Sequence, residues 1–145
     1  MEKLIGIACD HAGYKLKEKV KAYLQQEGYS VKDFGTNSEE SVDYPVFAHQ
    51  LASKINSGEL PRGIVICGTG NGVNMVANKY PHVRSALCWK PEIATLARQH
   101  NNANILALPA RFIEEDLAME TLKAYLTTDF EGGRHERRVN LIPIQ

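Results

Sequence analysis

A thiol beside a glycine-rich loop is the part of this chain best suited to chemistry. Residues 63–72 read Gly-Ile-Val-Ile-Cys-Gly-Thr-Gly-Asn-Gly, so a short apolar run ends at Cys67 and glycines follow at positions 68, 70 and 72. Glycines let backbone N–H groups approach an anion closely, and a thiol beside them can act as a base or nucleophile. We therefore predict that the chemistry is centred on Cys67. The alternative role of a lone cysteine at a strand end is that of a small buried hydrophobe.

Three familiar glycine-loop chemistries do not fit this spacing. A nucleotide-binding P-loop needs Lys and then Ser or Thr after its last glycine, whereas Val73 and Asn74 follow Gly72. A dinucleotide fingerprint has the pattern G-x-G-x-x-G near the first strand, but this loop reads G-x-G-x-G and lies mid-chain. A cysteine-dependent phosphatase needs an arginine about six residues after the thiol to clamp the phosphoryl group, and Val73 occupies that position. What remains is a thiol beside an anion-stabilising loop.

The composition limits the possible partners. The 145 residues are 43% hydrophobic, which predicts one domain spanning residues 1–145 with a single core. Basic and acidic side chains number 17 each, so no overall field attracts nucleic acid or an anionic membrane. We recognise no signal peptide, and no apolar stretch approaches the roughly 18 residues of a membrane span. Three cysteines without metal-ligand spacing (Cys9, Cys67 and Cys88) predict reduced thiols in a cytoplasmic protein that holds no metal.

Alternating strand and helix patterns predict the fold. The strand-like runs are residues 4–8, 29–34, 63–66, 83–88 and 104–108. The helical patterns between and after them end at Gly28, begin near Pro45, span about 73–78, begin at Pro91 and cover 117–126. Five strands, each followed by a helix, predict an α/β fold of Rossmann type, a flavodoxin-like, doubly wound, five-stranded parallel sheet in a single domain.

Candidate site residues gather at one edge of this predicted sheet. Ligands of open parallel sheets bind beyond the carboxyl ends of the strands. The residues that follow predicted strands are Asp10, His11, Tyr44, the loop 67–72 and Arg111. His100 and Asn101 instead end the fourth helix, on its apolar stripe, where a histidine is commonly a core or capping residue. A helix of about nine residues travels roughly 13 Å, so His100 should lie far from Cys67 of its own chain.

The C-terminal segment, residues 131–145, carries an arginine cluster. Two glycines precede three arginines within five residues, at positions 134, 137 and 138. If the segment is helical, Arg134 and Arg138 share one face and can bind a dianion such as a phosphate monoester. The alternative is a solvated charged tail. In a chain of zero net charge, a local cluster beside a glycine hinge favours phosphate binding.

Six short motifs occur in order along nearly the whole chain. They are CDHAG (9–13), SVDYP (41–45), CGTGNG (67–72), ANK (77–79), RQHN (98–101) and GGRH (132–135). Together they resemble the ribose-5-phosphate isomerase type B family, which also includes galactose- and allose-6-phosphate isomerases. The resemblance implies aldose–ketose isomerisation of a sugar phosphate through an enediolate, without metal or other cofactor. It also implies a homodimer that shares its active site between subunits; a tetramer is the alternative assembly.

The residue types suit this chemistry. A base must remove a proton alpha to a carbonyl and return it to the neighbouring carbon, while donors hold the developing oxyanion. Cys67 can supply the base, and the loop of Gly68, Gly70, Asn71 and Gly72 can supply donors. The resemblance implies that His100 opens the sugar ring, supported by Asp10 and Thr69. The implied substrate-binding residues are His11, Arg134 and Arg138 for the phosphate, with Arg111 and Tyr44 nearby, and Asn101 for sugar hydroxyls.

The sequence departs from the common family pattern near the loop. Many members carry an apolar residue at the position of Asn71 and a serine at that of Asn74. One branch lacks the thiol and uses a glutamate at the position of Val73; here the thiol is present, which assigns the base to Cys67. The two other cysteines match no catalytic position, and we interpret them as structural. Two alternatives remain: an isomerase of a six-carbon sugar phosphate, and a non-catalytic flavodoxin-like module that binds a phosphorylated ligand. The shared-site hypothesis places three residues over the partner's loop: His100, Asn101 and, as a further candidate, Arg111.

Overall fold

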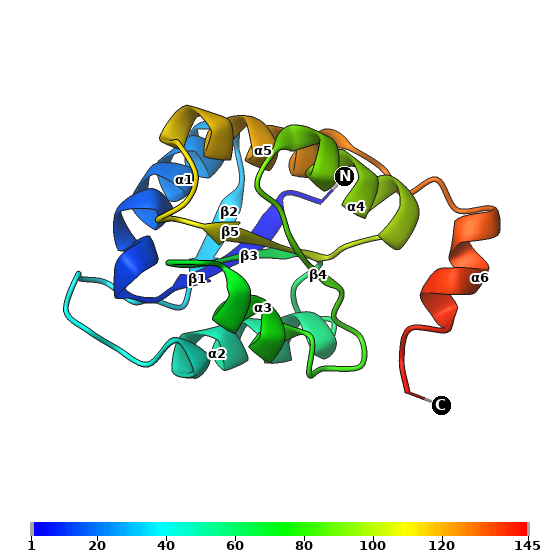
Figure 1. The fold of residues 1–145 in the computed structure, drawn as a ribbon, viewed down its shortest axis with the longest axis horizontal. Helices are drawn as coiled ribbons and strands as arrows, with labels where there is room; N and C mark the ends of the chain where they lie inside the picture. The colour runs from blue at the N-terminus through cyan, green and yellow to red at the C-terminus, as the bar shows by residue number, and fades with distance from the viewer. Residues whose placement is uncertain (1, 145) are drawn as a thin grey trace.

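The fold is a three-layer α/β structure built on one parallel sheet (Figure 1). The computed structural model describes residues 2–144. Its strands are β1 (Leu4–Cys9), β2 (Ser30–Asp33), β3 (Gly63–Cys67), β4 (Ser85–Leu87) and β5 (Ile105–Pro109). Every neighbouring pair is parallel. The predicted five-stranded parallel sheet is therefore confirmed.

Helices cover both faces of the sheet. They are α1 (Tyr14–Gln26), α2 (Tyr44–Asn56), α3 (Asn71–Ala77), α4 (Pro91–Asn101), α5 (Glu115–Thr127) and α6 (Arg134–Asn140), with a short 3-10 turn at His11–Gly13 before α1. One core cluster joins the sheet to α1, α4 and α5, and a second joins its other face to α2 and α3 (Figure 1). This division follows from right-handed crossovers between parallel strands. Within residues 2–144, no helix has the length and apolar character needed to cross a membrane.

The strand order decides which loops meet at the carboxyl edge. The order across the sheet is β2-β1-β3-β5-β4. Flavodoxin itself has the order 2-1-3-4-5, so the last two strands are exchanged here. As a result β5 pairs with β3, and Cys67 lies opposite Pro109 in the register. The exchange places the segment after β5 directly beside the glycine loop after β3.

The boundaries of the elements follow from burial and turn chemistry. β3 and β5 are buried along their whole length because they have strands on both sides and helices on both faces. β4 is an edge strand of three residues, shorter than the predicted run 83–88. α3 begins at Asn71, two residues before the predicted start, so the end of the glycine loop forms its first turn. The arginine tail is helical in α6, which puts Arg134 and Arg138 one helical turn apart.

Candidate active site

The glycine loop leads the chain from the buried thiol into α3. Cys67 ends β3 and is 5% exposed. Gly70 precedes α3 with a φ of +75°, a conformation that residues with a Cβ rarely adopt. A Cβ at this position would also lie 2.5 Å from Leu87 Cδ1. The exposed Thr69 stabilises the same turn, because its Oγ1 accepts the N–H of Asn71 at 3.2 Å.

Two side chains from other segments lie over this loop. Tyr44, the first residue of α2, packs on Gly72, where a Cβ would lie 2.5 Å from ring atom Cε1. Arg111 follows β5; its N–H donates to the Gly68 carbonyl at 2.9 Å, and its side chain lies against the same glycine. Arg111 therefore belongs to the loop of its own chain, which corrects the expectation that it reaches over a partner's loop. Its side chain is exposed and can therefore reach an anion bound at this edge.

Strand β1 brings an acid and an imidazole to the same edge. Asp10 is 7% exposed, and its Oδ1 accepts the N–H groups two and three residues further along at 2.9 and 3.2 Å. Its own N–H donates to the Ile66 carbonyl of β3 at 3.2 Å, one residue before the thiol. His11 Nδ1 accepts the N–H of Val42 at 3.1 Å. In the neutral ring the proton must then lie on Nε2, which leaves a donor for a substrate oxygen.

The three cysteines differ in their surroundings. All are free and buried within residues 2–144. Burial raises the pKa of Cys9 to about 12, and it raises the pKa of Cys88 equally, to about 12. Both therefore stay protonated near neutral pH, which agrees with the structural role predicted for them. Cys67 is the thiol that adjoins the glycine loop at the carboxyl edge of the sheet.

A second group of predicted residues lies at the opposite edge. His100 and Asn101 end α4, which runs back from the carboxyl edge over about 13 Å. Arg134 and Arg138 are exposed on α6, which packs near the end of α4 and far from the glycine loop (Figure 1). One chain thus holds two separate groups of candidate residues: the loop with its neighbours, and the group around His100. The structure does not bring Cys67 and His100 of the same chain together.

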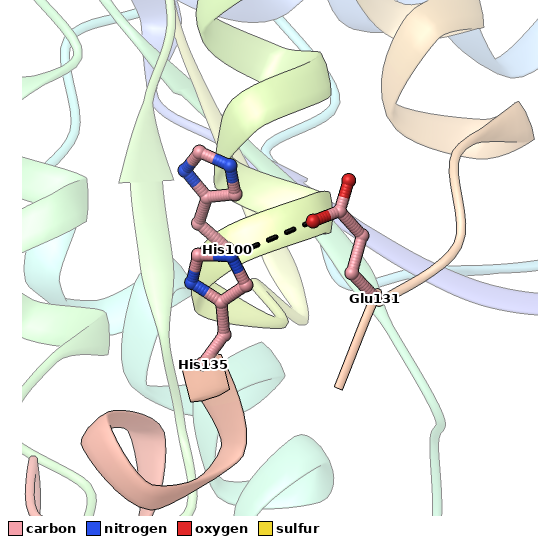
Figure 2. Close-up of side chains that lie close together, drawn as sticks. All are labelled: His100, Glu131 and His135. Carbon is pink, nitrogen blue, oxygen red and sulfur yellow. Dashed lines mark ion pairs between the residues drawn. The ribbon is translucent and has the colours of Figure 1, made fainter. Parts of the chain in front are cut away.

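Sequence reasoning missed two neighbours of His100. The rings of His100 and His135 are stacked, with centroids 4.2 Å apart and planes inclined by 13°. His135 Nε2 lies 3.5 Å from Glu131 Oε1 (Figure 2). Burial of the ring, and then the nearby His100 and Arg134, lower the pKa of His135 below its ordinary value. The motif GGRH already contained His135, but the pattern alone could not place it on His100.

Asn74, next to the loop, has a distinctive environment. Its Oδ1 is buried and has no hydrogen-bond partner among the described residues. Asn74 lies in the first turn of α3, one turn after Gly70, and its N–H donates to the Gly70 carbonyl at 3.2 Å. An unsatisfied buried amide oxygen next to the loop is unusual, since such groups are normally paired. Asn74 therefore places a buried, unpaired amide oxygen beside the candidate site.

The fold and its edge residues define the class of protein. A parallel α/β sheet that presents a thiol, a glycine loop, a carboxylate and an arginine at its carboxyl edge is suited to proton transfer on a small anionic substrate. Comparison with known proteins gives the family. The chain belongs to the Ribose/Galactose Isomerase family, whose model matches residues 5–142.

Individual relatives match over nearly the full length. Ribose-5-phosphate isomerase B of Escherichia coli is 44% identical over 140 residues, covering 97% of this chain and 94% of the relative. The structure of a ribose 5-phosphate isomerase from Thermotoga maritima superposes with a TM-score of 0.95 at 52% identity, covering 99% of both chains. Ribose-5-phosphate isomerase B of Mycoplasma genitalium, solved with bound ribulose-5-phosphate, has a TM-score of 0.92 at 42% identity over 96% of this chain and 93% of that one.

Proposed function

We propose that this protein interconverts ribose 5-phosphate and ribulose 5-phosphate. The observation that carries the proposal is the full-length likeness to the Mycoplasma genitalium enzyme solved with bound ribulose-5-phosphate. The thiol and glycine loop at the carboxyl edge support it, because this isomerisation needs a base and an oxyanion site side by side.

In the proposed reaction, Cys67 acts as the base. The thiolate removes the C2 proton of the open-chain aldose, which gives an enediolate. The thiol then returns this proton to C1 while the hydroxyl proton passes from O2 to O1, which gives the ketose. The oxyanion that forms is stabilised by donors of the glycine loop, residues 68–72. One well-placed donor supplies on the order of 3 kcal/mol of transition-state stabilisation. No atoms are gained or lost overall, so the reaction consumes no oxidant and no nucleotide.

The substrate is a cyclic sugar for most of the time, so the ring must open first. We assign this step to His100, supported by Asp10 and Thr69 at the edge of the sheet. Because His100 lies about a helix length from Cys67 of its own chain, it serves the loop of a second subunit. A two-fold dimer makes two such composite sites, since each chain gives one half-site and receives the other.

The same arrangement unites the phosphate-binding residues. His11 lies at the carboxyl edge, whereas Arg134 and Arg138 lie on α6 beyond the opposite edge. In the composite site the partner's α6 brings its two arginines to His11, close to Arg111 and Tyr44. Asn101, next to His100, contacts the sugar hydroxyls. The dimer thus explains why one chain carries its phosphate-binding residues in two distant places.

Uncovered apolar side chains support the dimer. In the single chain, large hydrophobic side chains remain exposed on several elements: Val46, Met75, Trp89, Leu96 and Phe112. Leu96 belongs to the stripe of α4 that ends at His100 and is 43% exposed. Aromatic and Met side chains such as these are enriched in protein–protein interfaces. Three reduced thiols also support a cytoplasmic location for the enzyme.

Turnover measurements test this function directly. Purified protein treated with a chelator should convert ribose 5-phosphate to ribulose 5-phosphate without added metal or nucleotide. Cys88→Ala removes a buried thiol from the other core cluster, on the opposite face of the sheet, and provides the matched control for Cys67→Ala. Allose 6-phosphate and galactose 6-phosphate test the six-carbon alternative in the same assay. Absence of turnover on all three sugars would favour a non-catalytic phospholigand-binding module.

A further inference from the structure

Three potential metal ligands converge at the end of α4. They are His100 from α4, Glu131 from the segment after α5, and His135 from the first turn of α6. Figure 2 shows that their side chains lie close to one another. One ligand atom from each lies within 4.8 Å of the other two. The pair His135 Nε2 and Glu131 Oε1 is closer, at 3.5 Å. The cluster therefore joins the end of α4 to the short stretch 131–135, in which Glu131 and His135 are four positions apart.

The backbone under this cluster is held in place. The N–H of Glu131 donates to the Gln99 carbonyl at 3.1 Å, one residue before His100. The guanidinium of Arg98 donates to the carbonyl of Thr128 at 3.0 Å. These bonds fix the segment after α5 to the last turn of α4. The backbone of Glu131 is consequently held beside the backbone of His100.

The donor set and its spacing suit a divalent transition metal. Two imidazoles and one carboxylate form the ligand set of open zinc sites, with metal–ligand distances of about 2.0–2.2 Å. Two ligands of a tetrahedral zinc then lie about 3.4 Å apart, which the 3.5 Å separation of His135 and Glu131 already matches. The stacked rings must splay for both nitrogens to face one ion. This requires rotation about the soft terminal torsion of each histidine.

We propose that His100, Glu131 and His135 bind a divalent transition metal such as Zn²⁺, and that the bound metal inhibits isomerisation. The ion occupies an imidazole nitrogen of His100, which then cannot exchange a proton with the sugar ring. Mg²⁺ and Ca²⁺ prefer oxygen ligands and bind weakly to such a set. The inhibitory part of this inference rests on the proposed function, whereas the binding part does not.

Calorimetric titration of metal-stripped protein with Zn²⁺ tests the site. One equivalent should bind per chain, and His135→Gln and Glu131→Gln should each weaken binding by at least about tenfold. His49→Gln, which alters a histidine on α2, should leave binding unchanged. Cys67→Ala should also bind Zn²⁺ like the wild type. Equal affinity in the wild type and His135→Gln, or loss of binding in Cys67→Ala, would overturn the assignment.

Activity measurements separate the two parts of the inference. Zn²⁺ should inhibit the wild type in the range of its measured affinity, a chelator should restore turnover, and Mg²⁺ should have no effect. In Glu131→Gln the inhibition, relative to that variant's own metal-free rate, should need about tenfold more Zn²⁺. Tight binding without inhibition would overturn the inhibitory role. Binding to a protein that isomerises no sugar phosphate would preserve the metal site and reject the proposed function.

Discussion

Removal of the Asp33 carboxylate should destabilise this protein strongly, because it takes the closest counter-ion from a buried lysine and leaves only the half-exposed Glu18 at 3.5 Å. Lys17 is fully buried, and its Nζ lies 2.9 Å from each oxygen of Asp33 and 3.3 Å from Asn37 Oδ1. Asp33 also accepts the N–H of Gly35 at 2.8 Å and a bond from Lys21 at 3.0 Å. The cluster joins α1 to the segment after β2, which leads toward the site residue Tyr44.

The size of the effect follows from burial. Breaking a buried ion pair by removing one partner costs about 3–5 kcal/mol, because the other charge stays buried and unpaired. An exposed pair contributes about 0–1 kcal/mol. Asp33→Ala should therefore lower the free energy of unfolding by about 3 kcal/mol or more. Glu59→Ala, which removes the exposed partner of Lys54, should change it by less than about 1 kcal/mol.

Urea unfolding of both variants, followed by circular dichroism, measures this difference. The double variant Lys17→Met with Asp33→Ala should regain part of the lost stability, since no buried charge is left uncompensated. An Asp33→Ala loss no larger than that of Glu59→Ala would refute the reasoning. So would a double variant that is less stable than Asp33→Ala.

The pH dependence of stability gives a second readout of the same pair. Burial alone would raise the pKa of Asp33, but hydrogen bonds from Lys17, Gly35 and Lys21 outweigh it and lower the pKa below its ordinary value. A lowered folded-state pKa contributes stability that is fully present above the unfolded value of about 3.9. That contribution is lost as the pH falls through the folded-state pKa. The stability gap between wild type and Asp33→Ala should accordingly narrow in acid.

The remaining predictions concern the site. Cys67→Ala should abolish turnover while leaving the fold and substrate binding largely intact, and Cys67→Ser should also be severely impaired; wild-type turnover by the alanine variant would reject the assigned base. Arg134→Ala should weaken binding of ribose 5-phosphate but not of free ribose, measured by calorimetry, whereas equal losses would make α6 purely structural. Gly70→Ala should lower the unfolding free energy by about 1 kcal/mol or more and reduce kcat, because Gly70 has a positive φ and an added Cβ would contact Leu87. An unchanged unfolding free energy and an unchanged kcat would show that the loop tolerates a Cβ.

Sequence patterns predicted the elements but not how they are ordered in space. The apolar runs of β3 and β5 show that both strands are buried, yet burial does not specify which strand lies beside which. The exchange of β4 and β5 was therefore not predictable, and neither was the position of Arg111 on Gly68. The carboxyl-edge rule did place Asp10 beside the thiol loop, since it depends only on strand direction.

Contacts between distant segments account for the other missed features. The bond between His11 and Val42 joins residues 31 positions apart. The stacking of His135 on His100 depends on how the segment after α5 returns to the last turn of α4. The periodicity of apolar residues along a helix or strand does not indicate which distant segments pack against each other. It did predict that His100 ends a helix, and this was enough to separate it from Cys67 of the same chain.

Subunit complementation tests the shared active site most directly. Cys67→Ala and His100→Ala should each be inactive alone, and they should be mixed in equal amounts under conditions that exchange subunits. Random pairing makes about half of the dimers heterodimers, each with one intact site of two, so about one quarter of wild-type activity should return. Heterodimers that form, as shown by mass spectrometry, but recover no activity would contradict the account.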